Sequence, residues 1–350
     1  MDELAVAGHR VTLIDVANRA GVSPATVSRV LNNNYPVAAS TRERVVEAVQ
    51  HFDYVLNVHA GALVHARSGI LGIVVADVSD PFFSEIVRGA QDVAEAAGHL
   101  TMICSSGADP RQELAYLTLL RNHRADAVLL VGAGSEQPEL QAALARQADG
   151  IARQGSRLVL VGRPAPVGTD AASVVELDNH RSGALIGEHL AGLGHRRIRY
   201  LAGPTGTTTT SARLAGFLEG ARAGGVLRSG VEVVHGPQNR DTGRRLVRRA
   251  LEDGAVFSAV AASNDLMAIG ALVALREAGL RVPDDVSVVG IDDVPVAADV
   301  TPGLSTVHLP LSELGAAAAE LALTAASALV QPALPAYLVI RESTARPPAA

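Results

Sequence analysis

Lysine is absent from this chain of 350 residues, so all 30 basic residues are arginine. Without lysine the chain has no Walker-type phosphate-binding lysine, no Schiff-base nucleophile and no lysine general base. It has a single cysteine, Cys104, which excludes a disulfide framework and favours a reducing compartment. These absences remove several classes of enzyme.

Long apolar runs and a secretory leader are also missing. Gly, Asp and Arg interrupt the apolar segments, whereas a membrane-spanning helix needs about 20 apolar residues. The first residues, MDELAVAGHR, lack the charged start and apolar stretch of a signal peptide. The 11 histidines form no ligand cluster such as HExxH. We therefore expect a cytoplasmic protein without membrane association, metal or cofactor.

The charge balance by itself does not indicate a nucleic-acid partner. The formal net charge is −6, and residues 1–68 contain as many acidic as basic residues. DNA binding must therefore rest on a motif and not on bulk charge. With 48% hydrophobic residues, a chain of this length can bury large cores, and we expect two or three domains.

The amino-terminal part of the chain predicts three short helices with no strand between them. Thr12 begins the first helix with a capping box, and Gly21 ends it. Ser23 is the N-cap of the second, with Pro24 at its first position. A third helix is expected to begin with Ser40 as its cap.

From Ile70 onward, short β-branched runs alternate with helical segments. This alternation predicts parallel sheets with helices on both faces, and the number of runs favours two sheets over one. We expect two doubly wound lobes with a ligand site between them, at the carboxyl ends of the strands. The runs are 70–77, 100–105, 126–132, 157–162, 172–177, 197–202, 231–235, 256–262, 286–291, 304–308 and 336–341.

Residues 12–31, TLIDVANRAGVSPATVSRVL, have the spacing of a helix, a glycine-containing turn and a second helix. This is the pattern of a helix-turn-helix, whose second helix enters the major groove of DNA. The spacing alone leaves open a small helical cap on an α/β enzyme. The identities of the residues, in addition to their spacing, favour the helix-turn-helix over the helical cap.

With Asn32 included, this passage closely resembles the signature of the LacI/GalR (lactose-repressor) family of bacterial transcriptional regulators, and the resemblance extends to about Ser343. It implies an all-α helix-turn-helix DNA-binding domain at 1–56 and a hinge helix at 57–68. It also implies an α/β periplasmic-binding-protein-like core of two doubly wound lobes, 69–162 with 305–333 and 163–304 with 334–346. Its landmarks in the core are VADVSDPFFSEIVRGAQ (75–91), LGHRRIRYLAGP (193–204), SARLAGF (211–217), SNDLMAIGAL (263–272) and VSVVGIDDVPVA (286–297).

The resemblance implies a set of DNA-contacting residues. Arg29 on the second helix suits a guanine, whose O6 and N7 it can bind together. Leu63 is the candidate apolar wedge in the minor groove, although Gly61 departs from the helix formers usual in this hinge. Other members of the set hold phosphates. The full set is Thr12, Ser23, Pro24, Ala25, Thr26, Ser28, Arg29, Asn32, Tyr54, Asn57, Ala60 and Leu63.

The resemblance also implies an effector site between the lobes. Arg213 is its expected main ligand group, because an arginine makes paired hydrogen bonds to vicinal hydroxyls or a carboxylate. Phe82 would stack on a sugar ring, and Arg163 is either a second ligand group or an exposed salt-bridge partner. For Asp77, Phe82, Asn264 and Asp292 the alternative is a cap, a turn or core packing. The expected set is Asp77, Phe82, Arg163, Arg213, Gln238, Asn264 and Asp292.

These implications describe a non-enzymatic transcriptional regulator, usually a repressor in this family. It would bind double-stranded operator DNA of pseudo-palindromic sequence as a homodimer and respond to a small-molecule effector, a sugar in preference to a purine. The tail RESTARPPAA lacks the heptad leucines of a tetramer-forming coiled coil. One alternative is a transport receptor with the same core, which would need a secretion signal and no helix-turn-helix. Another is an enzyme such as a sugar kinase, for which a phosphate loop is missing.

Overall fold

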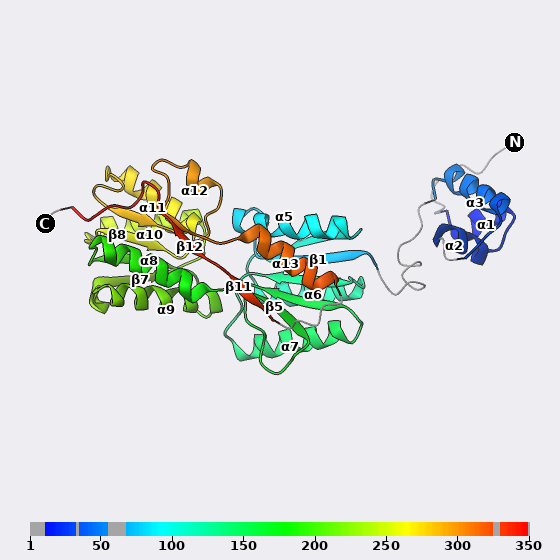
Figure 1. Cartoon of the computed structure of the whole chain (residues 1–350), viewed down its shortest axis with the longest axis horizontal. Coiled ribbons are helices and arrows are strands. Elements are labelled where there is room, and N and C mark those ends of the chain that lie inside the picture. Colours follow the sequence, from blue (N-terminus) through cyan, green and yellow to red (C-terminus); the bar gives the residue numbers. More distant parts are fainter. Residues whose placement is uncertain (1–10, 33–34, 55–67, 325–329, 349–350) are drawn as a thin grey trace. The chain divides into compact units, whose positions relative to one another are not determined.

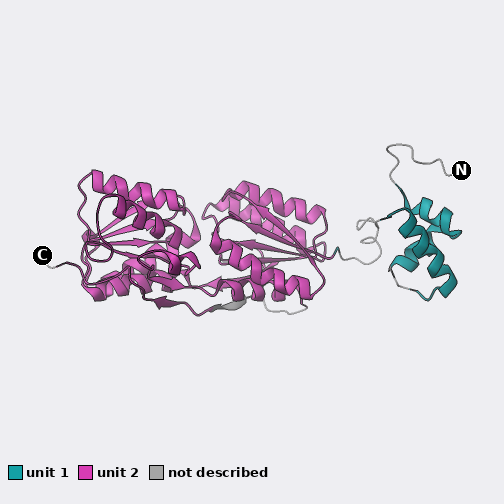
Figure 2. Cartoon of the chain, turned by 90° about the horizontal axis from the view of Figure 1, so that it is seen from above, with its two compact units in different colours: residues 1–68 teal, residues 69–350 magenta. Residues whose placement is uncertain are grey.

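The computed structural model describes residues 11–32, 35–54, 68–324 and 330–348. They form two compact units, Met1–Ser68 and Gly69–Ala350, which are coloured separately in Figure 2. The first unit is helical and the second contains the parallel sheets. Each unit has its own hydrophobic core and is described by itself.

The first unit consists of the helices α1 (Leu13–Ala20), α2 (Pro24–Asn32) and α3 (Ala39–His51). Thr12 and Asp15 form the expected capping box, and Gly21 ends α1 with a φ of 64°. Helix α3 begins before Ser40, and its N-cap residue, Ala38, makes no side-chain capping bond. A small buried cluster from all three helices holds the unit together; its members are Val16, Ala17, Ala20, Val27, Val30, Val45 and Ala48.

The second unit begins with a lobe built on a six-stranded, wholly parallel sheet in the order β11-β5-β4-β3-β1-β2. Helices α5 and α13 pack together on one face, while α6 and α7 pack together against β1, β3 and β4. The strands are β1 (Ile70–Val75), β2 (Leu100–Ser105), β3 (Ala127–Val131), β4 (Arg157–Val161), β5 (Ala172–Leu177) and β11 (Val330–Leu334). The helices are α5 (Pro81–Ala96), α6 (Pro110–Asn122), α7 (Pro138–Ala152) and α13 (Leu311–Leu323).

The second lobe has a four-stranded parallel sheet in the order β7-β6-β8-β9, with α8 packed on α9 and α10 packed on α11. Glycines allow the close approach of α8 and α9, since a Cβ at Gly216 would lie 1.8 Å from the His180 carbonyl oxygen. The strands are β6 (Ile198–Ala202), β7 (Val231–His235), β8 (Ala259–Ala262) and β9 (Ser287–Val289). The helices are α8 (Asn179–Leu193), α9 (Thr208–Ala223), α10 (Arg240–Glu252), α11 (Asp265–Glu277), α12 (Val296–Asp299) and the 3-10 turn Arg228–Gly230.

The chain passes between the two lobes three times (Figure 1). The first passage joins β5 to α8. The second follows β10 (Thr306–His308) into α13, and the third leads from β11 to β12 (Tyr337–Val339). Strands β10 and β12 pair with each other in antiparallel fashion, so the second and third passages lie side by side.

The strand pairing corrects the expected division of the core. Strand β5 was expected in the second lobe, from residue 163 onward, but it pairs with β4 and belongs to the first sheet. From residue 305 onward, the strand expected at 304–308 was assigned to the first lobe. His308 forms a bridge with Asp292, which follows β9, so this strand lies beside the sheet of the second lobe. Strand β11 was not expected, and the run 336–341 appears as the shorter β12. Spacing identifies a strand but not the sheet that it joins.

Among the described residues, no helix is long and apolar enough to cross a membrane.

Candidate functional site

The first turn of α2 is the most solvent-exposed part of that helix. Ser23, Pro24 and Ala25 are exposed, whereas Val27 and Val30 are buried against the other helices. The Ser23 hydroxyl accepts a hydrogen bond from the Thr26 backbone N–H at 3.2 Å and so caps the helix. The helix therefore buries one face and presents its first turn.

Arg29 is exposed in the last turn of α2, and its guanidinium lies 5.5 Å from the centre of the Tyr35 ring. Tyr35 is itself 65% exposed, so an aromatic side chain supports the arginine at the surface. Such a cation–π contact contributes roughly 0.5–1 kcal/mol at an exposed site. Sequence reasoning missed Tyr35, because only the fold brings its ring to Arg29.

The other expected DNA-contacting residues take several positions. The Thr12 hydroxyl donates to the Asp15 carboxylate at 2.7 Å, and Tyr54 packs against the core of the unit. Ser28 is half-buried, and Asn32 is the last residue of α2. The hinge residues Asn57, Ala60 and Leu63 lie outside the described residues.

Arg213, on the second turn of α9, is the centre of a buried polar cluster in the second lobe. Its Nε donates to Asn179 Oδ1 at 2.9 Å, and its Nη1 donates to the Ser263 carbonyl oxygen. The same Nη1 lies 3.2 Å from Asp292 Oδ1. Nε and Nη1 of Arg213 make these bonds, and Nη2 makes none with the described residues, which leaves it available for a ligand.

Asp292 follows β9 and is only 3% exposed. Burial raises the pKa of Asp292 to about 7; the Arg213 guanidinium opposes this shift, and the Asp80 carboxylate adds to it. Asp80 is the N-cap of α5 in the first lobe. Its charge therefore contributes to the raised pKa of Asp292 across the boundary between the lobes.

The sequence did not predict two carboxyl groups near this cluster, those of Asp80 and Asp265. Burial raises the pKa of Asp80, and the Asp77 carboxylate adds to that rise. Burial also holds the pKa of Asp265 well above its usual value, with Asp292 as the next cause. Asp265 accepts hydrogen bonds from the Thr306 hydroxyl and from the Val294 backbone N–H. The Asp-Pro step at 80–81 was a usable N-cap signal, whereas Asp265 had none.

Gln238 and Asn264 join the same cluster. The Asn264 side chain caps α11 by accepting from the Met267 N–H, and its Nδ2 donates to the Gln238 carbonyl oxygen at 3.3 Å. Gln238 Nε2 donates to the Ser263 hydroxyl at 3.3 Å. The structure therefore brings four of the seven expected residues together: Arg213, Gln238, Asn264 and Asp292.

Asp77 and Phe82 lie in the loop and first helical turn after β1, in the first lobe. The Asp77 carboxylate accepts from the Ser79 N–H and hydroxyl at 2.9 and 2.7 Å, and these bonds lower the pKa of Asp77. Phe82 is half-buried, with its ring edge-on to Phe83 at 5.0 Å between centroids. In this structure, Asp77 shapes a turn and Phe82 packs at the margin of the core.

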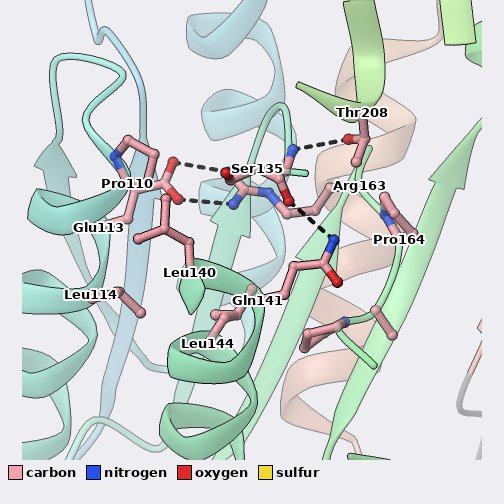
Figure 3. A pocket seen from close by; sticks show the side chains of 13 residues that line it. Pro110, Glu113, Leu114, Ser135, Leu140, Gln141, Leu144, Arg163, Pro164 and Thr208 are labelled. Carbon is pink, nitrogen blue, oxygen red and sulfur yellow. Dashed lines mark hydrogen bonds and ion pairs between the residues drawn. The ribbon is translucent and has the colours of Figure 1, made fainter. Parts of the chain in front are cut away.

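Arg163 is buried, which corrects the expectation of an exposed salt-bridge partner. Its guanidinium makes two bonds to the Glu113 carboxylate, at 2.9 and 3.0 Å, and Nε donates to the Gly132 carbonyl oxygen. Figure 3 shows this pair beside a cavity of about 40 Å³, where Thr208 of the second lobe bonds the Gly134 N–H. The arginine is occupied by the protein itself, which favours the salt-bridge alternative.

No three His, Cys, Asp or Glu side chains of the described ranges are grouped so that they could hold a metal ion.

A three-helix unit with the helix-turn-helix pattern and a two-lobed core with a buried polar cluster together define the class of a ligand-responsive DNA-binding regulator. The comparisons with known proteins agree with this class. Residues 12–57 match the model of bacterial regulatory proteins of the lacI family, and residues 188–344 match the periplasmic binding protein-like domain.

The chain is 31% identical over 307 residues to the HTH-type transcriptional regulator DegA of Bacillus subtilis, covering 88% of this chain and 89% of DegA. It is 34% identical over 315 residues to GalR of Escherichia coli K12, with coverages of 90% and 89%. The lac repressor dimer bound to operator and the anti-inducer ONPF matches with a TM-score of 0.77 and 27% identity, covering 96% of this chain and all of that one. The complex of CelR with cellobiose matches with a TM-score of 0.68 and 32% identity, covering 95% and 100%.

The chain therefore belongs to the lacI family of bacterial regulatory proteins. The expected family, the fold class and the function of a DNA-binding transcriptional regulator are confirmed.

Proposed function

We propose that this chain is a repressor that binds a pseudo-palindromic operator as a homodimer and changes its operator affinity when a neutral sugar binds between the core lobes. The observation that carries the effector part is the buried Arg213–Asp292 pair of the second lobe; the charge of Asp80, in the first lobe, contributes to the raised pKa of Asp292. A ligand that touches groups of both lobes has a different affinity for each lobe arrangement. It can therefore shift the equilibrium between those arrangements.

The charges of the cluster favour an uncharged ligand. Arg213 is the cation of the cluster, and it is accompanied by the carboxyl groups of Asp80, Asp265 and Asp292. Arg163 is neutralised by Glu113. A phosphate or carboxylate ligand would meet three carboxyl groups and one arginine here. Burial raises the pKa of all three carboxyl groups, and sugar hydroxyls can hydrogen-bond a carboxyl group in either protonation state and accept from Arg213 Nη2. Sugars also occur in related structures, those with bound cellobiose and ribose.

The relatives found are transcriptional regulators, which supports a role without catalysis. The DNA part of the proposal assigns base contacts to Pro24, Ala25 and Arg29, because the first turn of α2 is exposed and Arg29 follows on the same helix. Thr12, Ser23, Asn32 and Tyr54 would hold phosphates, which fixes the register of the helix on the duplex.

Self-association is proposed through the first lobe. Strand β2 is an edge of its sheet and exposes two apolar side chains, Leu100 at 67% and Ile103 at 38%. An exposed apolar edge strand is a ready pairing surface. The dimer of the related lac repressor is consistent with this proposal.

The function is tested by titrating the purified chain, at moderate salt, into a labelled duplex from its own promoter region. The titration is repeated with ribose, cellobiose, galactose and glucose 6-phosphate. We expect sequence-dependent binding that at least one neutral sugar changes and the phosphate does not. Failure to prefer promoter DNA over random duplex contradicts DNA recognition. A response to the phosphate alone contradicts the neutral ligand.

The hinge has a separate test. Leu63→Ala should weaken operator binding and reduce DNA bending, because the apolar wedge that opens a base step is removed. Sugar affinity of the core should be unchanged. Bending is measured by energy transfer between the ends of the duplex, and equal bending by both proteins would remove Leu63 from the wedge role.

A further inference from the structure

The Arg213–Asp292 pair lies beside the first and second passages between the lobes. Asn179, which accepts from Arg213 Nε at 2.9 Å, is the first residue of α8, directly after the first passage. Asp292 is bonded through its backbone to β10, since its N–H donates to the Val307 carbonyl oxygen at 2.9 Å. Leu309 follows β10 at the start of the second passage, and its backbone N–H donates to the Asp292 carbonyl oxygen at 3.3 Å.

Asp293, the next residue, fastens the second and third passages to each other. One carboxylate oxygen, Oδ2, lies 2.9 Å from Nδ1 of His308, the last residue of β10. The other, Oδ1, accepts from Nη2 of Arg341 at 2.6 Å, just beyond β12. The His308 ring also stacks on Tyr337 of β12, with 4.8 Å between centroids. The Asp293 side chain is only 14% exposed, so water and salt screen these contacts weakly.

The backbone at Asp292 and Asp293 is strained. Their φ angles are 126° and 58°, in the region that favours glycine. Non-glycine residues adopt such angles where surrounding contacts hold them there. The strained pair directs one carboxylate to Arg213 and the next to His308 and Arg341. A single peptide unit therefore joins the residue that contacts Arg213 to the residue that contacts His308 and Arg341.

We propose that Asp293 is the positioning residue that couples occupancy of the Arg213–Asp292 site to the second and third passages, and thereby to the angle between the lobes. The proposal rests on the proposed function, in which an effector binds at this site. Asp293 does not touch the effector. It transmits a change at Asp292 to His308 and Arg341, whose segments move if the lobes rotate.

The test is a double-mutant cycle read by hydrogen exchange, without sugar or DNA. The variants are Arg213→Gln, which perturbs the site, Asp293→Asn, which tolerates the left-handed backbone but loses the charge, and their combination. The readout is the exchange rate of the amides at 335–342, a segment apart from Asn179, Ser263 and Asp292, to which Arg213 bonds. We expect Arg213→Gln to raise that rate about threefold or more in the natural chain and to leave it nearly unchanged when Asp293 is Asn.

The proposal is overturned if Arg213→Gln raises the exchange rate by the same factor whether residue 293 is Asp or Asn. If Asp293 had only a structural role, Asp293→Asn would change the exchange rate by the same factor with and without Arg213→Gln. The matched control is Asp285→Asn, which removes a carboxylate paired with Arg281 on the same lobe and should give additive effects. If Arg213→Gln does not fold, Arg213→Lys takes its place. Additive effects of the two substitutions refute the coupling through Asp293 and do not bear on the proposed sugar effector. Failure to find a sugar that changes operator binding contradicts the proposed effector and does not alter the result of the double-mutant cycle.

Discussion

Replacing Arg29 by alanine tests DNA recognition at a single side chain. Arg29 is exposed on α2, and its guanidinium rests on the Tyr35 ring at 5.5 Å. If it binds a guanine, the substitution removes two hydrogen bonds to one base and little else, because no buried contact of the helix depends on it.

The expected loss follows from two opposing contributions. A bidentate contact to a guanine is worth about 1–3 kcal/mol of discrimination. The cation–π contact with Tyr35, worth roughly 0.5–1 kcal/mol, is given up if the guanidinium moves to the base. The net loss is at most about 2.5 kcal/mol and about 1 kcal/mol at mid-range, or roughly a 5-fold weaker operator affinity.

The assay is fluorescence anisotropy with the promoter duplex at several salt concentrations. Arg19→Ala is the matched control, because Arg19 is also exposed and lies 5.6 Å from an aromatic ring, that of Phe52, but belongs to α1. A base contact leaves the salt dependence nearly unchanged, whereas a lost phosphate contact reduces the slope by about one. The reasoning is refuted if Arg29→Ala weakens operator and random duplex equally, or if Arg19→Ala costs as much.

Three further substitutions test the core. Glu113→Gln leaves Arg163 buried without its carboxylate, so urea denaturation should show a loss of about 3–5 kcal/mol; a loss no larger than that of a surface substitution would contradict the importance of the pair. Gly216→Ala places a Cβ 1.8 Å from a carbonyl oxygen of α8 and should cost about 1–3 kcal/mol, while Gly192→Ala, with open space around it, should cost nothing. Arg213→Ala should abolish the sugar response with operator binding retained, and an unaltered response would remove this arginine from the site.

The helical unit could be predicted from the sequence because its signals are local. The capping box of Thr12 and Asp15, the left-handed Gly21 and the Ser23–Pro24 start each act within four residues, and all appear as expected. The cap at Ser40 was wrong, because α3 starts earlier without a side-chain cap.

The family resemblance identified Arg213, Gln238, Asn264 and Asp292, which the structure brings together. It did not identify Asp80, whose influence on Asp292 acts across the lobes. Nor did it identify Glu113 as the partner of Arg163, since the two are 50 residues apart in the chain.

The helix-turn-helix and the alternation of strands and helices could be predicted from residue types and spacing, because caps, turns and periodicity act over a few residues; the family followed from the resemblance of residues 12–32. The sheet that β5 joins and the pairing of Arg163 with Glu113 could not be predicted in this way and became visible in the folded chain. The tertiary structure alone set Asp293 between the two return passages. Such pairings depend on which segments a fold brings within hydrogen-bonding distance, and that distance is independent of separation along the chain.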